Sequence, residues 1–457
     1  MKKDRNIPVE KNKHYVMQVE DIGVNGEGIG KVKGYTLFVE GALPGEEVEV
    51  RAVKVKKNFG YGKLLKIIRS SEHRKEPSCA IAKRCGGCQL QHLSYEGQLQ
   101  YKTKKVQDIM ERIGGLKDIK VLPTLGMDEP YHYRNKAQFP VGKTEDLNIG
   151  FYARRSHDII NTDECEIGHP INKEIIRVIK GFIKAFDISV YDEVKHRGLI
   201  RHIVTRTSHH TGEIMACIVI NGRSLPNTVT LIEALKAIEG VAGICLNYNQ
   251  EKTNVILGKE IKMLWGKEKI VDYIGDLKFE ISPLSFFQVN PIQTEVLYNR
   301  ALEYAGLTGE EVVWDAYCGI GTISLFLAQK AKQVYGVEIV EPAIKDARNN
   351  ADINGITNAE FFVGKAEVII PEKYVEGIKA DVIVVDPPRK GCDGKLLNTL
   401  VEMAPKRIVY VSCDPATLAR DLKYLVEHGF EVDQVQPVDM FPHTTHVETV
   451  VKLNLTL

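Results

Sequence analysis

Cys413 is the residue whose type and position best suit covalent chemistry. It follows the apolar run at 408–411 and precedes ATLARDLKYLVEHG, a segment with helical periodicity. The dipole of a helix N-terminus favours the thiolate form of a nearby cysteine, and the thiolate is the nucleophilic form. A single cysteine is more often only a buried core residue. The assignment therefore depends on whether a base accompanies Cys413.

Three residues near the end of the chain are candidates for that base. Glu448 interrupts the apolar run at 447–451, which is unusual for a carboxylate without a function. His443 and His446 are rivals, and each also fits a purely structural hydrogen bond. A thiolate paired with a base suits methylation of C5 of uracil. The thiolate adds to C6, C5 attacks a sulfonium methyl group, and the base removes the C5 proton so that the thiolate can leave.

The segment DAYCGIG at 315–321 has the form of a cofactor-binding turn. It ends an apolar strand and opens a helix, and Gly319 and Gly321 let a ligand approach the backbone. Glu338 ends the next strand, where a carboxylate can accept hydrogen bonds from ribose hydroxyls. NAD usually requires a third glycine for its pyrophosphate, but that position is Ser324. The pattern therefore favours S-adenosylmethionine, which has no phosphate.

Asp386 opens the sequence DPPRKG directly after the apolar strand at 380–385. Ligands of open α/β sheets bind beyond the carboxyl ends of the strands, so Asp386 is expected to reach the cofactor or the target base. A plain turn with a helix cap is the alternative. Asp-Pro-Pro is also similar to a motif of amino-group methyltransferases, but Arg389 stands where an aromatic residue would stack on the base. Amino-group methylation is therefore the weaker interpretation.

The bulk composition limits the classes of protein to consider. A length of 457 residues suggests about three domains of roughly 150 residues each. The net charge of +1 means that any nucleic-acid surface must be a local patch. The N-terminus has no apolar signal-like core, and no apolar run approaches the ~20 residues of a membrane helix. We therefore expect a cytoplasmic protein without a membrane partner, and the sequence implies no obligate protein partner.

Three regions differ in their pattern, and we expect an α/β protein with domains at 8–70, 74–288 and 289–457. Short strands broken by glycines suggest a small N-terminal β-barrel. Phe59 and Tyr61 lie among its basic residues, which suits RNA phosphates and stacked bases. The middle region mixes helices and strands and has basic stretches at 133–136 and 197–206. The last region alternates apolar strands with helices, which predicts a Rossmann-like parallel sheet covered on both faces. The basic residues of the barrel are Arg51, Lys54, Lys56, Lys57, Lys63, Lys66 and Arg69.

Taken together, the motifs resemble the RNA uracil-5 methyltransferase family, which includes ribosomal and transfer RNA enzymes. They follow the family's order across the C-terminal third, and weaker similarity extends over nearly the whole chain. The resemblance implies that Cys413 is the nucleophile and Glu448 the base. The cofactor contacts that it implies are Gln288, Tyr317, Glu338 and Asp386. The matching segments are SFFQVN (285–290), DAYCGIGTISL (315–325), DPPRKG (386–391), SCDPATLARDL (412–422) and DMFPHTTHVETV (439–450).

The N-terminal barrel resembles a TRAM domain, an OB-like RNA-binding module common in the ribosomal RNA members. This resemblance favours 23S rRNA as the substrate, with transfer RNA as the alternative. A flipped base or an unpaired loop is implied, because the uridine must leave its stack to meet Cys413. A non-catalytic RNA-binding assembly factor is the rival from another class, and the presence of both Cys413 and Glu448 argues against it.

A cysteine cluster stands apart from these motifs. Cys79, Cys85 and Cys88 have the spacing C-x5-C-x2-C, and Cys165 is the candidate fourth ligand. Four thiolates suit zinc and an iron–sulfur cluster equally, and spacing alone does not separate them. The family resemblance implies a [4Fe-4S] cluster. The spacing differs from the C-x3-C-x2-C of radical enzymes, so a role in shaping the RNA-binding region is expected instead.

Overall fold

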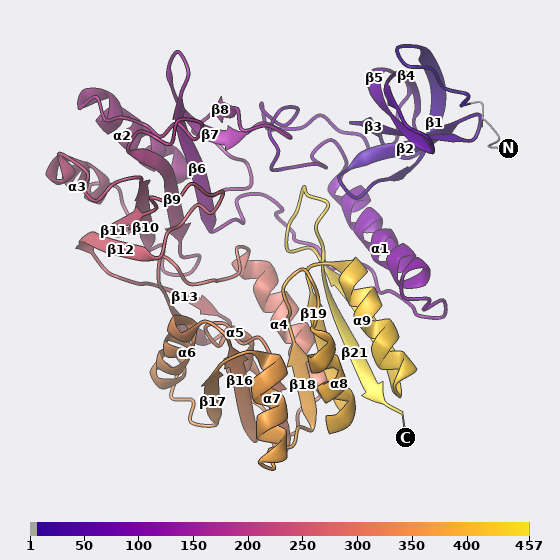
Figure 1. The fold of residues 1–457 in the computed structure, drawn as a ribbon, viewed down its shortest axis with the longest axis vertical. Helices are drawn as coiled ribbons and strands as arrows, with labels where there is room; N and C mark the ends of the chain where they lie inside the picture. Colours follow the sequence, from indigo (N-terminus) through magenta and orange to yellow (C-terminus); the bar gives the residue numbers. More distant parts are fainter. Residues whose placement is uncertain (1–6, 457) are drawn as a thin grey trace. The chain divides into compact units, whose positions relative to one another are not determined.

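The computed structural model describes residues 7–456, which form two compact units. The first unit ends at Lys102 and also includes Phe441–Thr445, and the second contains Thr103–Met440 and the residues from His446 on. In the first unit, five strands close into a barrel in the order β1-β2-β3-β5-β4, as Figure 1 shows. Its strands are β1 (His14–Ile22), β2 (Glu27–Val32), β3 (Tyr35–Glu40), β4 (Glu47–Val55) and β5 (Phe59–Arg69).

The sequence of the barrel explains its closure. Alternate residues of β3, including Leu37 and Val39, point inward and are fully buried, as the two-residue period of a strand requires. Gly30 has no room for a Cβ atom because the backbone of Gln18 on β1 lies against it. A parallel pairing of β3 with β5 completes the ring. The predicted N-terminal barrel is confirmed.

The second unit contains a seven-stranded central sheet in the order β12-β11-β10-β9-β6-β7-β8. Helices α2 and α3 lie against this sheet (Figure 1), and the apolar face of α2 packs with residues of β6, β9 and β10 in one core. Both β9 and β10 are buried along their whole length. The elements are β6 (Lys136–Lys143), β7 (Leu147–Tyr152), β8 (Ile159–Asn161), α2 (Asn172–Ala185), β9 (Ile200–Thr207), β10 (Ile214–Ile220), α3 (Thr228–Lys236), β11 (Val241–Tyr248) and β12 (Glu260–Gly266).

The same unit contains the C-terminal sheet, with strand order β17-β16-β15-β18-β19-β21-β20. The five strands from β17 to β19 are parallel, and β21 runs antiparallel to both of its neighbours. The elements are α4 (Pro291–Ala305), β15 (Val312–Asp315), α5 (Thr322–Ala328), β16 (Gln333–Glu338), α6 (Glu341–Ile353), β17 (Ala359–Val363), α7 (Ala366–Val375), β18 (Val382–Val385), α8 (Gly394–Met403), β19 (Arg407–Ser412), α9 (Pro415–Glu427), β20 (Phe430–Val438) and β21 (Glu448–Leu455).

The predicted alternation of strands and helices from residue 291 onward is confirmed, with one difference at the sheet edge. The link between β20 and β21 is too short for a parallel crossover, so the last strand returns antiparallel. It inserts between β19 and β20. This reversal brings the start of β21 beside the end of β19.

Two segments ahead of the C-terminal sheet support it. The second half of α1 (Tyr95–Arg112) contributes Val106 and Met110 to the core of that sheet, and Val121 forms a bridge with Val435 on β20. The hairpin of β13 (Ile270–Ile274) and β14 (Leu277–Ile281) lies between the two sheets in the sequence. Residues 106–121 thus pack with the C-terminal sheet, although the sequence placed them in the middle domain at 74–288.

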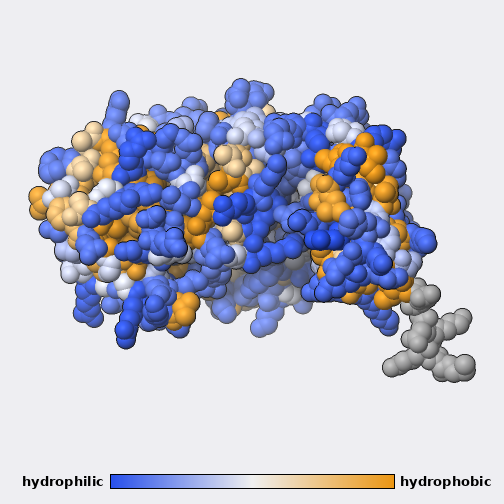
Figure 2. Space-filling view, turned by 90° about the horizontal axis from the view of Figure 1, so that it is seen from above, coloured by the Kyte–Doolittle hydropathy of each residue, from blue (hydrophilic) through white to orange (hydrophobic). Residues whose placement is uncertain are grey.

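None of the helices in residues 7–456 is long and apolar enough to cross a bilayer. The face drawn in Figure 2 is mainly hydrophilic, with apolar residues in scattered groups. One exposed apolar side chain stands out by its position, because Phe286 in the SFFQVN segment is 71% exposed.

Candidate active site

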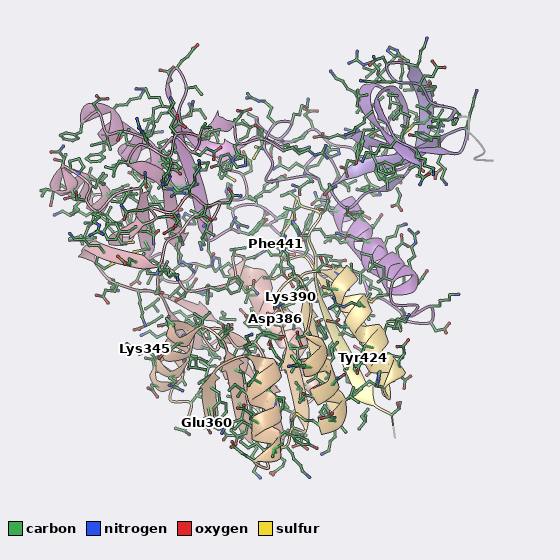
Figure 3. The ribbon with its side chains drawn as sticks, viewed as in Figure 1. Lys345, Glu360, Asp386, Lys390, Tyr424 and Phe441 are labelled. Carbon is green, nitrogen blue, oxygen red and sulfur yellow. The ribbon has the colours of Figure 1, made fainter. Side chains whose placement is uncertain are left out.

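The candidate catalytic residues gather beyond the carboxyl ends of the central parallel strands. Strand β15 ends at Asp315, and β18 ends one residue before Asp386, which Figure 3 shows above the sheet. From β15, the next two strands of the chain, β16 and β17, are added on one side of the sheet, whereas β18 and β19 are added on the other side. Such a switch point opens a crevice in which α/β sheets bind their ligands. Cys413 directly follows β19, so it lies at the same edge of the sheet.

The strand register places Cys413 beside Glu448. Ser412 on β19 pairs with Thr449 on β21 in an antiparallel ladder. Cys413 directly follows Ser412, and Glu448, the first residue of β21, directly precedes Thr449. The two side chains lie close enough for the charge of Glu448 to raise the pKa of Cys413. The pair that the sequence proposed as nucleophile and base is therefore adjacent in space, although 35 residues separate its members.

Burial gives the carboxyl groups of this site unusual acidities. Glu448 is 4% exposed, and its burial, reinforced by the charge of Asp386, raises its pKa to about 8. Burial and the charge of Asp315 raise the pKa of Asp386 to about 7. Asp315 itself has a pKa raised to about 6, again mainly by burial, although Ser324 donates a hydrogen bond of 2.6 Å to its Oδ2. Three carboxyl groups thus titrate near neutral pH, which is typical of acid–base sites.

The thiol of Cys413 differs from the expectation based on the helix dipole. Burial and the negative charges of Glu448 and Asp386 raise its pKa to about 11, while Arg389 opposes this shift. Desolvation therefore outweighs the favourable helix terminus in setting the acidity of this thiol.

The raised pKa of Glu448 predicts a pH-dependent effect on stability. Because the folded-state pKa lies above the unfolded value, the neutral form is favoured by folding, and stability is lost as pH rises from about 4.5 towards 8. Replacing Glu448 with Gln removes this loss. We expect Glu448→Gln to raise the melting temperature at pH 9 by several degrees and to leave it nearly unchanged at pH 4. Thermal unfolding at both pH values is the measurement, and an equal shift at both would contradict a buried ionising Glu448.

The turn after β15 has the geometry that the sequence predicted for a cofactor loop. Gly319 and Gly321 adopt positive φ angles of 54° and 85°. A Cβ atom on Gly321 would come within 3.2 Å of Ala347, so this turn requires glycine on steric grounds. Glu338 ends β16, and its Oε1 accepts a hydrogen bond of 2.9 Å from the Val340 N–H.

Gln288 and Tyr317 complete the predicted cofactor set. Gln288 is buried, and its backbone oxygen accepts a 3.0 Å hydrogen bond from Asn135 Nδ2, so the central sheet fixes its position. Tyr317 is partly buried against the core of the C-terminal sheet. Its hydroxyl group lies beside the Cys392 thiol, and burial raises the pKa of Tyr317.

The two histidines that rivalled Glu448 have other surroundings. The His443 N–H donates a 2.8 Å hydrogen bond to Gln98 Oε1, and its Nδ1 lies 3.2 Å from Gln98 Nε2. Its backbone oxygen accepts hydrogen bonds from both Gln89 and Leu90. These contacts assign His443 a structural part in the first unit. His446 is exposed, whereas Glu448 is buried and its charge acts on the Cys413 thiol.

Sequence reasoning missed Tyr298 on α4. This side chain is 2% exposed, and its hydroxyl lies 2.9 Å from Thr322 Oγ1 at the start of α5. Burial raises its pKa, and the charges of Asp386, Asp315 and Glu448 contribute to that shift. Tyr298 therefore lies close enough to sense all three carboxyl groups. The helix contains a second buried tyrosine, Tyr304, and its sequence offers no signal that would have singled out Tyr298.

The cysteine-rich segment belongs to the first unit. Residues 75–94 contain no helix or strand, and turns hold Cys79 and Cys85, with the Cys85 N–H bonded to the Ile81 oxygen at 2.8 Å. The Gly87 N–H donates a 3.4 Å hydrogen bond to Cys85 Sγ, and Cys88 is buried. No group of three or more His, Cys, Asp and Glu side chains within residues 7–456 has metal-binding geometry. Cys165 belongs to the second unit.

A solved structure is similar to nearly the whole chain. The tRNA (uracil-54, C5)-methyltransferase of Pyrococcus abyssi, in complex with S-adenosyl-L-homocysteine, is 33% identical in sequence and superposes with a TM-score of 0.78. The match covers 96% of this chain and 100% of that one. Because it includes the barrel, the two sheets and their connections, the whole architecture is shared.

Curated relatives are closer in sequence. A protein of Clostridium tetani described as an uncharacterized RNA methyltransferase is 57% identical over 99% of this chain and 98% of its own length. A protein of Halalkalibacterium halodurans with the same description is 56% identical over 98% of each chain.

Two family models divide the chain between them. The TRAM domain model matches residues 8–65, which contain most of the barrel. The model described as tRNA (Uracil-5-)-methyltransferase matches residues 94–456, which include β15, β18, β19 and β21 with their candidate catalytic residues. This chain, with its TRAM barrel and its crevice at the ends of β15, β18 and β19, belongs to the tRNA (uracil-5-)-methyltransferase family.

Proposed function

We propose that the protein transfers a methyl group from S-adenosylmethionine to C5 of a uridine in 23S rRNA, with Cys413 as the nucleophile and Glu448 as the base. Two observations carry the proposal: Cys413 and Glu448 flank the paired residues Ser412 and Thr449, and the charge of Glu448 acts on the Cys413 thiol. A thiol and a buried carboxyl group with a pKa near 8 are the two groups that C5 methylation requires.

The chain's residues have distinct tasks in the reaction. Asp386 takes the proton of Cys413, and the thiolate adds to C6 of uracil, which places an electron pair on C5. When bound, S-adenosylmethionine would supply a sulfonium methyl group to the C5 carbanion, and the S–CH3 bond would break to release S-adenosylhomocysteine. Ionised Glu448 then removes the proton from C5. The electrons of that C–H bond restore the C5–C6 double bond, and the C6–S bond breaks to release Cys413 as a thiolate.

The residues of the crevice fit S-adenosylmethionine. Gly319 and Gly321 allow backbone approach, and Glu338 at the end of β16 is suited to the ribose hydroxyls. Gln288, Tyr317 and Asp386 are proposed to contact the rest of the cofactor.

We further propose that Cys79, Cys85 and Cys88 hold a [4Fe-4S] cluster with Cys165. Support comes from the three thiols in a short segment without regular structure, and from the N–H group of Gly87 directed at Cys85 Sγ. Such hydrogen bonds stabilise thiolate ligands. The place of Cys165 in this set rests on the resemblance. A bound cluster would cross-link the segment, so its role is structural.

Anaerobically purified protein should therefore be brown and contain about four irons per chain. Single changes of these cysteines to Ser should remove the colour, because each removes one of four ligands. Cys245→Ser in the buried core of the central sheet is the matched control and should keep the colour. One stoichiometric zinc in a colourless wild-type protein would contradict the cluster.

Transfer RNA is the second candidate substrate, and one observation favours it. The Pyrococcus abyssi enzyme, whose name specifies tRNA, matches 96% of this chain, so a TRAM-like region does not by itself distinguish the two substrates. The support for 23S rRNA is the resemblance of the barrel to the TRAM domain that is common in ribosomal RNA members.

Mass-spectrometric mapping of m5U separates these possibilities. A strain that lacks the gene should lose m5U from 23S rRNA and keep it in transfer RNA. Loss of m5U from transfer RNA alone would show that transfer RNA is the substrate. Unchanged m5U in both RNAs, together with no activity of the purified protein, would indicate an assembly factor with an idle catalytic domain.

A further inference from the structure

Arg206 on β9 is a buried cation with incomplete hydrogen bonding. The residue is 3% exposed, and its Nη2 donates a 2.7 Å hydrogen bond to the Ser285 oxygen. Its Nε and Nη1 atoms have no hydrogen-bond partner among the described residues. A buried guanidinium group with unpaired N–H donors costs free energy of folding, and buried charges are normally paired. Arg206 therefore indicates a ligand that completes its surroundings.

Two more cations lie beside Arg206. Lys136 on β6 is its direct cross-strand partner, and the Arg134 Nε donates a 3.0 Å hydrogen bond to the Lys136 backbone oxygen. None of the three forms an ion pair within the part of the chain that the structure describes. Burial and the charges of Arg206 and Arg134 lower the pKa of Lys136 to about 8. The three side chains thus repel one another, and an anion between them would relieve this repulsion.

The cation group is joined to the catalytic crevice by short hydrogen bonds. Asn135, between Arg134 and Lys136, donates from its N–H to the Val289 oxygen at 2.9 Å and from Nδ2 to the Gln288 oxygen at 3.0 Å. The contact from Arg206 reaches Ser285 in the same SFFQVN segment. That segment also presents the exposed ring of Phe286, and nucleic-acid bases stack on such rings.

We propose that Arg134, Lys136 and Arg206 bind a backbone phosphate of the RNA beside the uridine that enters the crevice. The proposal rests on the proposed function, because it takes the polyanion to be the RNA substrate. A phosphate presents several acceptor oxygens, which suits two guanidinium groups and an ammonium group at once. Lys136 and Arg134 are partly exposed and Arg206 lies beneath them, so the phosphate would meet the first two at the surface.

Binding of poly(U) by the full-length protein across a salt series tests this site. We expect Lys136→Gln to weaken binding about tenfold and to reduce the salt slope by about 0.7, the value for one phosphate contact to a single strand. Lys184→Gln is the matched control, because Lys184 is an exposed cation on α2, across the central sheet. It should bind poly(U) as the wild type does. Equal affinity and equal slope for Lys136→Gln and the wild type would overturn the proposal.

A second variant separates an anion site from a structural role. Arg206→Met removes a buried charge that lacks partners, so the melting temperature should stay the same or rise while poly(U) affinity falls. If Arg206→Met lost stability in proportion to its loss of binding, Arg206 would be structural. Binding by Lys136→Gln, at a partly exposed position, would then decide whether the phosphate site exists. If both variants lose S-adenosylmethionine affinity and keep RNA affinity, the cations bind the cofactor carboxylate and the phosphate proposal is wrong.

The proposed function can fail independently of this site. Wild-type protein that binds poly(U) through Lys136 but methylates neither 23S rRNA nor transfer RNA would contradict the enzyme assignment and keep the phosphate site. If the wild-type protein is active and both variants bind RNA as the wild type does, the enzyme assignment stands and the phosphate site is contradicted.

Discussion

Glu448→Gln is expected to accumulate a covalent protein–RNA adduct that already carries the transferred methyl group. Attack by Cys413 and methyl transfer both precede removal of the C5 proton, so the reaction should stop after them. The change also removes a charge that raises the pKa of Cys413, which makes thiolate formation easier. With methyl-labelled S-adenosylmethionine, a denaturing gel should show label in a protein–RNA band, and release of m5U should fall by about 10⁴-fold or more.

The two nearby histidines provide the internal control for this result. His446→Gln should turn over as the wild type does, because His446 is exposed. His443→Gln should affect stability more than chemistry, because His443 contacts Gln98. If either histidine variant accumulated the adduct and Glu448→Gln did not, the base would be that histidine.

Cys413→Ala is expected to abolish methylation while S-adenosylmethionine and RNA still bind. Without addition to C6, C5 of uracil is too weak a nucleophile, so the rate should fall by more than about 10⁴-fold. No adduct should form with any RNA. Calorimetry should find the cofactor affinity within about twofold of the wild type, because removing the half-buried thiol leaves the loops at Gly319 and Glu338 intact.

The matched control for this variant is Cys217→Ala. Cys217 lies on β10 and is 2% exposed, so this change costs stability through a small cavity and should leave the rate per folded molecule unchanged. Retained methylation by Cys413→Ala would remove the covalent mechanism, and methylation of an amino group would become the leading interpretation.

The sequence predicted the layers of the C-terminal region because continuous apolar strands and helices leave strong periodic signals. The strand β18, with four fully buried residues, is a clear example. The antiparallel insertion of β21 was not predicted, since strand order depends on pairing between distant segments and not on local pattern. Yet this insertion is what brings Glu448 to Cys413.

Motif residues could be predicted, but their electrostatics could not. Cys413 and Glu448 stand out by type and position, whereas the pKa of Cys413 depends on two carboxyl groups, Asp386 after β18 and Glu448 on β21, that meet only in the fold. Tyr298 and Arg206 show the same limit. The sequence marked Arg206 only as part of a basic stretch and did not mark Tyr298, and the significance of both residues comes from what surrounds them.

Trapping with RNA that contains 5-fluorouridine tests the central claim most directly. Fluorine at C5 cannot leave as a cation, so Glu448 has no proton to remove, and the wild-type protein should stall as a denaturant-resistant adduct. Mass spectrometry of the digested adduct should find a peptide with Cys413 bound to a methylated fluorouridine. An adduct at another cysteine would contradict the assignment of Cys413. Methylation of the natural RNA without any adduct on the fluorinated one would contradict covalent catalysis itself.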